Sequence, residues 1–219
     1  MNAWRPAALA LALALLLGAC ATAPPVTVPP QTPGPGAAER EAALWGARRA
    51  ALQDLTRWQA RGKVAYRLPD SAGSASLHWQ QEDDGSALRL AGPFGAGAVQ
   101  ISMDGPLLKL RRDGIERRYP ADAAPWLGGE RLLPIPVDAL QHWLRGLPDP
   151  QAPVDALDTE DGLARHLEQR GWRLDYGDYN ATNGLQLPAR ITISVPGAEL
   201  TLRLLLREWE FAAEGLSAP

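Results

Sequence analysis

The feature that most constrains the fold of this chain is a two-residue alternation that begins at Trp58. Over residues 58–68 (WQARGKVAYRL), Trp58, Val64 and Tyr66 fall on one face, and the other face carries mostly polar or charged residues. Successive side chains of a strand point to opposite faces of a sheet, so this segment is predicted to be a strand with one buried face. A chain with such a segment needs neighbouring strands that alternate in the same way.

The same alternation returns along most of the remaining chain. Residues 74–80 (SASLHWQ) place Leu77 and Trp79 on one face, and three further segments, SALRLAG, GAVQISM and LLKLRR, follow. Asp-Gly pairs at 84–85, 104–105 and 113–114 separate them, and such pairs are typical of tight turns between antiparallel strands. Beyond residue 166, three more segments alternate: LEQRGWRLDYGDY, ARITISV and LTLRLLLREWEF.

Two segments have helical periodicity instead. Residues 38–58 place Leu44, Arg48 and Leu52 at helical spacing, which predicts an amphipathic helix before the first strand. In the middle of the chain, Val137, Leu140, Trp143 and Leu144 share one helical face between Pro136 and Gly146.

The order helix, strands, short helix, strands predicts an α+β fold, an antiparallel sheet with helices on one side. So wide a sheet must curl, and its inner face exceeds what a few short helices can cover. Trp58, Trp79, Trp143 and Trp172 all fall on predicted inner faces. They belong either to a packed core or to a concave apolar site, and the sequence leaves both possibilities open.

The N-terminus predicts an exported lipoprotein. Residues 1–19 have a basic start, an apolar run and small residues, which is typical of a signal peptide and too short for a membrane span. The run ends in Leu-Gly-Ala-Cys, a bacterial lipobox that would make Cys20 the lipidated first residue. Cys20 is the only cysteine, so no disulfide forms within the chain. The following residue, Ala21, is not the aspartate that commonly retains lipoproteins at the inner membrane, which favours the outer membrane.

Residues 20–38 are proline-rich and predict a semi-rigid tether, reaching about 3 Å per residue, between the lipid anchor and a single domain over residues 39–219. The formal net charge of −3 argues against a nucleic-acid partner.

Motifs for catalysis are not found in the sequence. The three histidines, His78, His142 and His166, have no metal-ligand spacing, and we expect all three on the solvated surface. No nucleophile motif is present, so a periplasmic hydrolase is disfavoured, and neither a metal nor another cofactor is expected.

The segment LAGPFGAGAV (90–99) predicts a surface loop with an aromatic residue at its tip, formed by Pro93, Phe94 and Gly95. Phe94 could fold back on the core, fill a contact between molecules, be tolerated as a lone surface residue, or enter a membrane.

Several ordered segments carry a family resemblance: RWQARGKVAY, ASLHWQQ, LRLAGPFGAGAVQI, LLPIPVDALQHWLRGLP, QRGWRLDYGDY and LPARITI. With the lipobox, they make the chain similar to the LolB family, outer-membrane lipoprotein receptors of Gram-negative bacteria, over its whole mature length. The resemblance implies an incomplete, half-open antiparallel β-barrel whose helices close a hydrophobic cavity. It also implies a receptor that accepts lipoproteins from the periplasmic carrier LolA and inserts them into the inner leaflet of the outer membrane.

The loop of Pro93, Phe94 and Gly95 would contact the membrane, with Phe94 in place of the family's usual leucine. Acyl chains of the cargo would contact inner-face residues, and we expect a monomer. The candidate cavity residues are Trp58, Val64, Tyr66, Leu77, Trp79, Leu88, Leu90, Leu140, Trp143, Leu144, Trp172, Ile191, Ile193, Leu202 and Leu204. The alternative is a structural or assembly lipoprotein of the envelope without a lipid cavity.

Overall fold

The computed structural model describes residues 36–83, 85–105, 107–120 and 136–211. The predicted signal peptide, Cys20 and all but the last residues of the predicted tether lie outside the described residues.

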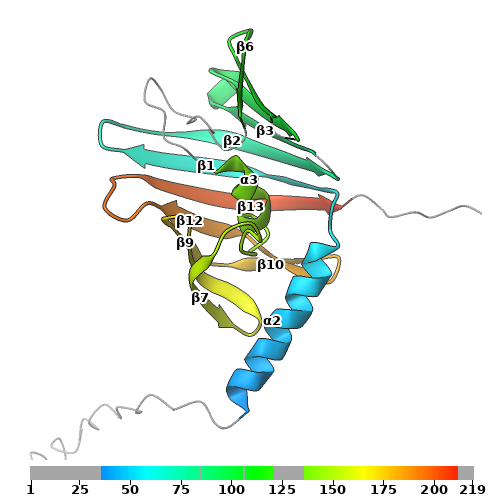
Figure 1. The fold of residues 1–219 in the computed structure, drawn as a ribbon. Coiled ribbons are helices and arrows are strands. Elements are labelled where there is room, and N and C mark those ends of the chain that lie inside the picture. Colours follow the sequence, from blue (N-terminus) through cyan, green and yellow to red (C-terminus); the bar gives the residue numbers. More distant parts are fainter. Residues whose placement is uncertain (1–35, 84, 106, 121–135, 212–219) are drawn as a thin grey trace, which may run out of the picture. The chain divides into compact units, whose positions relative to one another are not determined.

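An antiparallel sheet of eleven strands dominates the fold (Figure 1). Its spatial order is β6-β5-β4-β3-β2-β1-β13-β12-β9-β8-β7, so β6 and β7 lie at opposite edges and the described strands form no closed barrel. The strands of this sheet are β1 (Trp58–Leu68), β2 (Ser71–Glu82), β3 (Gly85–Ala91), β4 (Val99–Asp104), β5 (Leu107–Arg112), β6 (Ile115–Pro120), β7 (Val154–Glu160), β8 (Leu163–Gln169), β9 (Trp172–Tyr176), β12 (Arg190–Ser194) and β13 (Thr201–Phe211). The predicted incomplete, half-open antiparallel β-barrel is confirmed, in the form of an open antiparallel sheet with helices.

Two helices, a 3-10 turn and a small hairpin complete the described structure. They are the helices α2 (Ala37–Gln53) and α3 (Val137–Trp143), the 3-10 turn η1 (Pro93–Gly95), and the pair β10 (Tyr179–Thr182) and β11 (Leu185–Pro188). No described helix is long and apolar enough to cross a bilayer.

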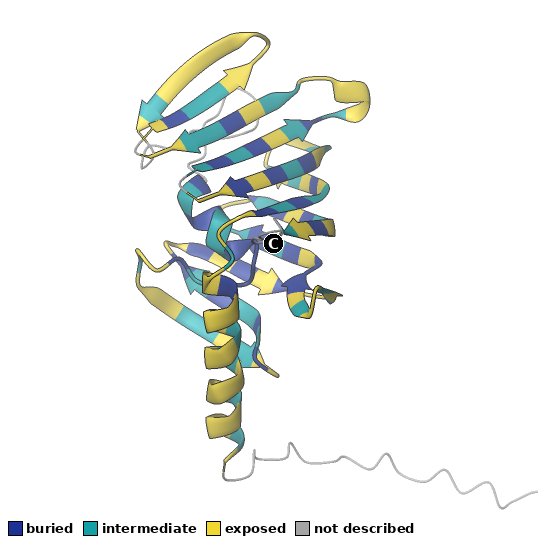
Figure 2. Ribbon diagram, turned by 90° about the vertical axis from the view of Figure 1, so that its right-hand side faces the viewer, coloured by how far each residue is buried: buried dark blue, intermediate teal, exposed yellow. Residues whose placement is uncertain are grey.

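Because apolar and polar residues alternate along the strands, one face of the sheet is buried and the other is exposed. Figure 2 shows this as buried and exposed stripes along the strands. At the Asp113-Gly114 turn both residues have positive φ, 50° and 78°, as a two-residue hairpin turn requires. The turn residues therefore set the register that keeps the apolar side chains on one face.

The central pair β1–β13 contains a β-bulge. Arg61 lies opposite Glu208, but Gly62 lies opposite Leu206, so Arg207 is an extra residue. The bulge explains why the buried face of β13 continues from Leu206 to Trp209, three residues on. A Cβ at Gly62 would lie 2.0 Å from the backbone oxygen of Leu205, so this position requires glycine.

Helix α3 forms as the sequence predicts. Pro136 precedes its first turn, and Gly146 follows it with a φ of 76°, which ends helices readily. The four apolar residues on its predicted face, Val137, Leu140, Trp143 and Leu144, are all buried.

Helix α2 is present, and its less exposed residues, Glu41, Trp45, Arg48 and Leu52, recur at helical spacing as predicted. Trp45 packs against the core and Leu52 is fully buried, but the predicted position of Leu44 is wrong, because Leu44 is exposed. Polar contacts also attach the helix: Arg48 donates to the backbone oxygens of Gln186 and Arg145, and the Glu41 carboxylate accepts from the backbone N–H of Gly162 at 2.9 Å. A half-buried arginine thus occupies the position that the helical spacing assigned to an apolar stripe.

Candidate functional site

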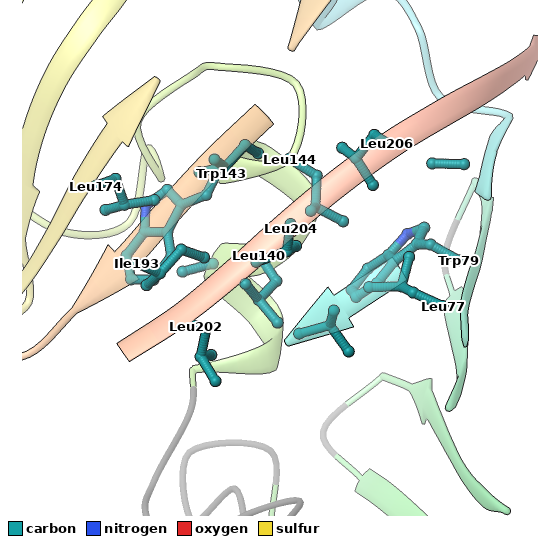
Figure 3. Close-up of a cluster of buried hydrophobic side chains, with 14 of the residues drawn as sticks. Leu77, Trp79, Leu140, Trp143, Leu144, Leu174, Ile193, Leu202, Leu204 and Leu206 are labelled. Carbon is teal, nitrogen blue, oxygen red and sulfur yellow. The ribbon is translucent and has the colours of Figure 1, made fainter. Parts of the chain in front are cut away.

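The inner face of the sheet holds one continuous apolar cluster (Figure 3). Thirteen of the fifteen candidate cavity residues are buried in it: Trp58, Val64, Leu77, Trp79, Leu88, Leu140, Trp143, Leu144, Trp172, Ile191, Ile193, Leu202 and Leu204. The other two, Tyr66 and Leu90, are half-buried at its margin. The structure therefore brings all fifteen together, twelve on the inner face of the sheet and three, Leu140, Trp143 and Leu144, on the helical segment that covers it.

Helix α3 covers the middle of this face. In Figure 3, Leu140 and Leu144 lie beside Leu204, and Trp143 lies near Ile193. The Tyr176 hydroxyl donates to the backbone oxygen of Trp143 at 3.0 Å, which attaches the end of α3 to β9.

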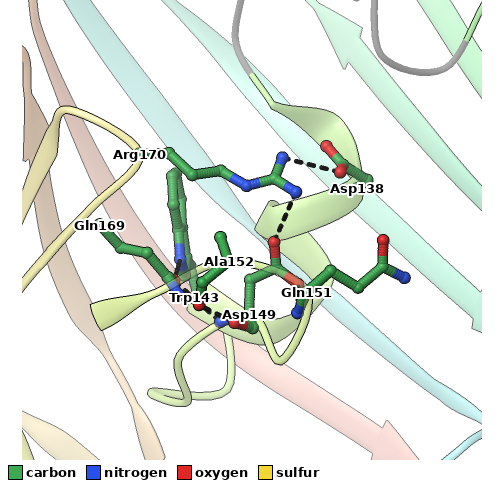
Figure 4. A network of polar contacts seen from close by, with 7 residues as sticks. All are labelled: Asp138, Trp143, Asp149, Gln151, Ala152, Gln169 and Arg170. Carbon is green, nitrogen blue, oxygen red and sulfur yellow. Dashed lines mark hydrogen bonds and ion pairs between the residues drawn. The ribbon is translucent and has the colours of Figure 1, made fainter. Parts of the chain in front are cut away.

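A buried amide, Gln169, fixes the chain after α3 (Figure 4). Its Oε1 accepts from the Trp143 indole N–H and from the Asp149 backbone N–H, both at 2.9 Å. Its Nε2 donates to the backbone oxygens of Asp149 and Ala152 at 2.8 and 2.9 Å. Arg170, which follows it, pairs with the carboxylates of Asp138 and Asp149 at 2.8 and 2.7 Å. These contacts hold α3 over the sheet.

Tryptophans and one arginine join the end of α2 to the same cluster. The Trp58 ring stacks on Trp79, with centroids 6.0 Å apart, and lies 5.3 Å from Trp209. The buried guanidinium of Arg145 lies over Trp58 and donates to the backbone oxygens of Leu52 and Leu55 at 2.6 and 2.9 Å. Burial lowers the pKa of Arg145 to about 10, which leaves it charged at neutral pH.

A half-buried apolar region extends this face toward β6. Val99, Met103, Leu110 and Tyr119 lie on β4, β5 and β6 and pack against the cluster without being fully buried. None of these four residues is among the candidate cavity residues, although the alternation of GAVQISM and LLKLRR already places the first three on one face.

The loop between β3 and β4 presents Phe94 entirely to solvent, with a relative exposure of 109%. Phe94 has φ 57° and ψ 21°, a left-handed conformation that costs a non-glycine residue about 1 kcal/mol. The loop bonds to itself: the Gly92 N–H donates to the Ala96 oxygen at 2.9 Å, and the Gly95 N–H to the Gly92 oxygen at 3.0 Å. A loop fixed in this way holds its aromatic tip away from the core.

The histidines are bound into the surface more tightly than expected. All three are half-buried: His78 and His166 lie on the outer faces of their strands, as predicted, and the prediction of a solvated histidine is wrong for His142. Burial, with the charge of Arg145, lowers the pKa of His142 to about 4, because its Nδ1 lies 3.4 Å from the guanidinium. A hydrogen bond to Asp175 raises the pKa of His166. No group of metal-binding side chains occurs in the described part of the chain.

The sequence matches the model of a protein family described as "Outer membrane lipoprotein LolB" over residues 56–209, most of the described domain. The chain belongs to the LolB family. This confirms the resemblance and makes the protein a lipoprotein of the outer membrane that functions in lipoprotein localisation.

Two relatives within the LolB family illustrate the match. The outer-membrane lipoprotein LolB of Alkalilimnicola ehrlichii is 36% identical over 203 residues, covering 91% of this chain and 94% of that protein. That of Stutzerimonas stutzeri is 36% identical over 204 residues, covering 92% and 94%.

Solved structures share the fold. A LolA superfamily protein from Nitrosomonas europaea aligns with a TM-score of 0.56 at 9% identity, covering 79% of this chain and 94% of that one. A putative outer membrane lipoprotein-sorting protein domain from Vibrio parahaemolyticus aligns with a TM-score of 0.54 at 10% identity, covering 82% and 95%. At such low identity the likeness concerns the fold alone, which this LolB family member shares with both proteins.

Proposed function

We propose that this protein accepts lipoproteins from the periplasmic carrier LolA and inserts them into the inner leaflet of the outer membrane, without catalysing a reaction. The observation that carries the proposal is Phe94. Phe94 has a strained, left-handed backbone conformation, yet its aromatic side chain is fully exposed and contacts nothing in the domain. A partner outside the domain is the natural reason for keeping it.

The free energies of lipid transfer explain why a receptor is needed. At about 0.8 kcal/mol per buried CH₂, one long acyl chain gains on the order of 10 kcal/mol by leaving water, and three chains on the order of 30 kcal/mol. The cargo must therefore pass from one apolar surface to another. In our proposal the inner face of the sheet is the second of these surfaces.

We place the acyl chains against the part of the inner face formed by β3, β4 and β5. Leu90, Val99, Met103 and Leu110 are half-buried there, so a chain could contact them without unpacking a tight core. The residues under α3 are more deeply packed, and binding at Trp143 or Ile193 would require α3 to move.

Phe94 would bring this face to the bilayer. An aromatic side chain gains about 1.5 to 3 kcal/mol on entering an apolar phase, enough for brief contact and too little for permanent attachment. Permanent attachment would come from the lipidated Cys20, since stable anchoring takes more than one acyl chain. The predicted tether would allow the domain to reach both carrier and leaflet.

A transfer assay with purified carrier, a model lipoprotein and liposomes tests the proposal. Phe94→Glu should still accept cargo but fail to deliver it, because a carboxylate loses hydration in the leaflet and gains nothing. Phe94→Leu, the matched apolar variant, should deliver at close to the normal rate. Delivery by the Glu variant at the normal rate would show that the loop is not the membrane contact.

The tight packing of thirteen inner-face residues favours one alternative, a structural lipoprotein that binds no acyl chains. A fluorescent acyl probe distinguishes the two. Leu110→Asp, on the half-buried inner face, should abolish probe binding, whereas Leu107→Asp, which is exposed on the same strand, should leave it unchanged. No saturable binding by the unmodified protein would support the structural alternative.

A further inference from the structure

The outer face of the sheet carries a transverse row of basic side chains. The registers place Arg61 opposite His78, His78 opposite Arg89, Arg89 opposite Gln100, and Gln100 opposite Arg111. These five residues come from β1 to β5 and point away from the apolar face. Neighbouring strands lie about 4.8 Å apart, so Arg89 and Arg111 are about 10 Å apart with an amide between them.

Acidic partners occupy the two ends of the row but not its middle. Arg61 pairs with Glu208 and Glu210 at one end. At the other, Glu116, opposite Arg111, pairs with Arg118 at 3.1 Å. Within the described part of the chain, Arg89 and Arg111 form no ion pair.

These two arginines line an open groove of about 360 Å³, and so does the Phe94 loop. Gly95 and Gly97, on either side of Ala96, form one wall, and Gln100 lies between the arginines. Asp113 also lines the groove, but its carboxylate lies 3.5 Å from the Arg112 guanidinium. A second groove on the same face shares Arg89 and includes Lys63 and Arg207, which continues the basic surface inward.

The distance between the Phe94 loop and the groove is close to the distance between an inserted apolar side chain and the lipid headgroups. Phe94 and Ile115, which is 60% exposed, both lie at the sheet end where β3 and β5 terminate. Arg89 precedes the end of β3 by two residues, about 7 Å. Interfacial apolar groups sit about 5–10 Å below the headgroup boundary, so an inserted Phe94 would leave Arg89 and Arg111 among the phosphates.

We propose that this groove binds the phosphate of an anionic phospholipid in the leaflet that Phe94 enters, and so orients the domain on the membrane. The proposal rests on the membrane contact proposed above. The chain has a formal net charge of −3, so its overall charge does not attract an anionic surface. A local pair of arginines beside the inserting loop supplies that attraction, and the guanidinium geometry suits phosphate oxygens.

Vesicle co-sedimentation tests the groove, using residues 20–219 with Cys20→Ala to remove the acyl anchor. Vesicles of phosphatidylcholine alone, which carry no net charge, are compared with phosphatidylcholine vesicles that also contain phosphatidylglycerol. The unsubstituted groove should bind the anionic vesicles more tightly. Arg89→Gln with Arg111→Gln should lower that partition coefficient about 30-fold, the factor expected from two arginines near an anionic surface, and should leave binding to the neutral vesicles unchanged.

A matched control removes the same charge elsewhere. Arg49→Gln with Arg203→Gln changes two exposed arginines outside the groove and should preserve the preference for anionic vesicles. An equal loss in this control would overturn the proposal. Millimolar inorganic phosphate at constant ionic strength should leave vesicle binding unchanged, and displacement by it would assign the groove to free phosphate instead.

Three further outcomes separate this proposal from others. If the groove variant keeps its lipid preference but no longer accepts cargo from the carrier, the groove docks a protein and the lipid assignment is wrong. If the unsubstituted groove binds neither kind of vesicle, the membrane contact of Phe94 fails as well. If the unsubstituted protein binds both kinds of vesicle equally and Phe94→Asn abolishes this binding, the membrane contact of Phe94 stands and only the lipid assignment of the groove is wrong.

Discussion

At the scale of single residues, Phe94 combines two costs with no gain inside the domain. Its left-handed φ of 57° disfavours a side chain with a Cβ, and its ring is fully exposed. Asparagine tolerates this conformation better because its short polar side chain bonds locally. Phe94→Asn should therefore raise the free energy of unfolding by about 0.5 kcal/mol in urea denaturation while abolishing delivery to liposomes. A destabilised Asn variant would mean that the ring packs within the domain.

The Phe94 loop was predictable from the sequence, because proline and glycine on both sides indicate a turn. The left-handed backbone at Phe94 was not, since residue preferences favour Gly95 for that conformation. The structure has both residues left-handed, with φ values of 57° and 83°. A conformation that opposes local preference is visible only in three dimensions.

The partly buried environment of His142 should make the stability of the protein depend on pH. Its folded pKa of about 4 lies below the unfolded value of about 6.5, so the unfolded chain binds the proton more readily. The contribution of the neutral His142 to the free energy of unfolding is fully present above about pH 6.5 and is lost as the pH falls toward 4. His142→Gln should lessen the loss between pH 7 and pH 5 by about 2 kcal/mol, measured by urea denaturation at both values. Identical pH dependence of the two proteins would contradict the buried, neutral histidine.

At the scale of elements, the attachment of α3 depends on Gln169. Gln169→Ala would leave two donors and two acceptors without their partner, including the Trp143 indole. We expect a loss of about 3 kcal/mol in the free energy of unfolding. Gln151→Ala, an exposed neighbour in the same loop, should change it by less than about 0.5 kcal/mol. Similar effects of the two substitutions would show that the network contributes little.

The central bulge gives a second prediction for an element. Gly62→Ala forces a Cβ against the Leu205 oxygen, which lies on backbone and cannot rotate away. Thermal and urea unfolding should show a loss of about 3 kcal/mol or more. Gly46→Ala, in α2 with open space around it, should instead stabilise the protein by about 0.5 to 1 kcal/mol. A neutral Gly62→Ala would mean that the bulge relaxes easily.

The elements themselves were predictable where one physical rule dominated. Strands such as β1 and β13 have one buried face, and their alternation gives that face directly. The polar attachment of α2 was not predictable, because Arg48 and Glu41 attach it through backbone groups of β11 and the β7–β8 turn. No local sequence pattern predicts the hydrogen bond between Arg48 and Gln186, which are 138 positions apart in the chain. For the same reason the outer-face groove was not predictable, since only the register of β3, β4 and β5 brings Arg89 and Arg111 to the same row.

At the scale of the whole molecule, the sheet separates two chemistries that the proposed function needs. One face is apolar and covered in its middle by α3, while the other carries the basic row. The Phe94 loop and the β5–β6 turn lie at the same end of the strands. A domain held at that end by a bilayer would keep its apolar face beside the leaflet into which cargo must move.

The predicted anchor completes this arrangement and can be tested in the precursor. The lipobox assigns acylation to the Cys20 sulfur and cleavage to the peptide bond between Ala19 and Cys20. Serine should not replace Cys20, because its hydroxyl is a much weaker nucleophile than a thiolate. Cys20→Ser should therefore block both lipidation and removal of residues 1–19, observed as an unshifted precursor by mass spectrometry and as loss of the protein from outer-membrane fractions. Phe94→Leu should be processed normally, because the loop acts after anchoring. A Cys20→Ser protein that is still cleaved at the same bond and retained in the outer membrane would contradict the lipid anchor, and attachment would then have to come from the domain itself.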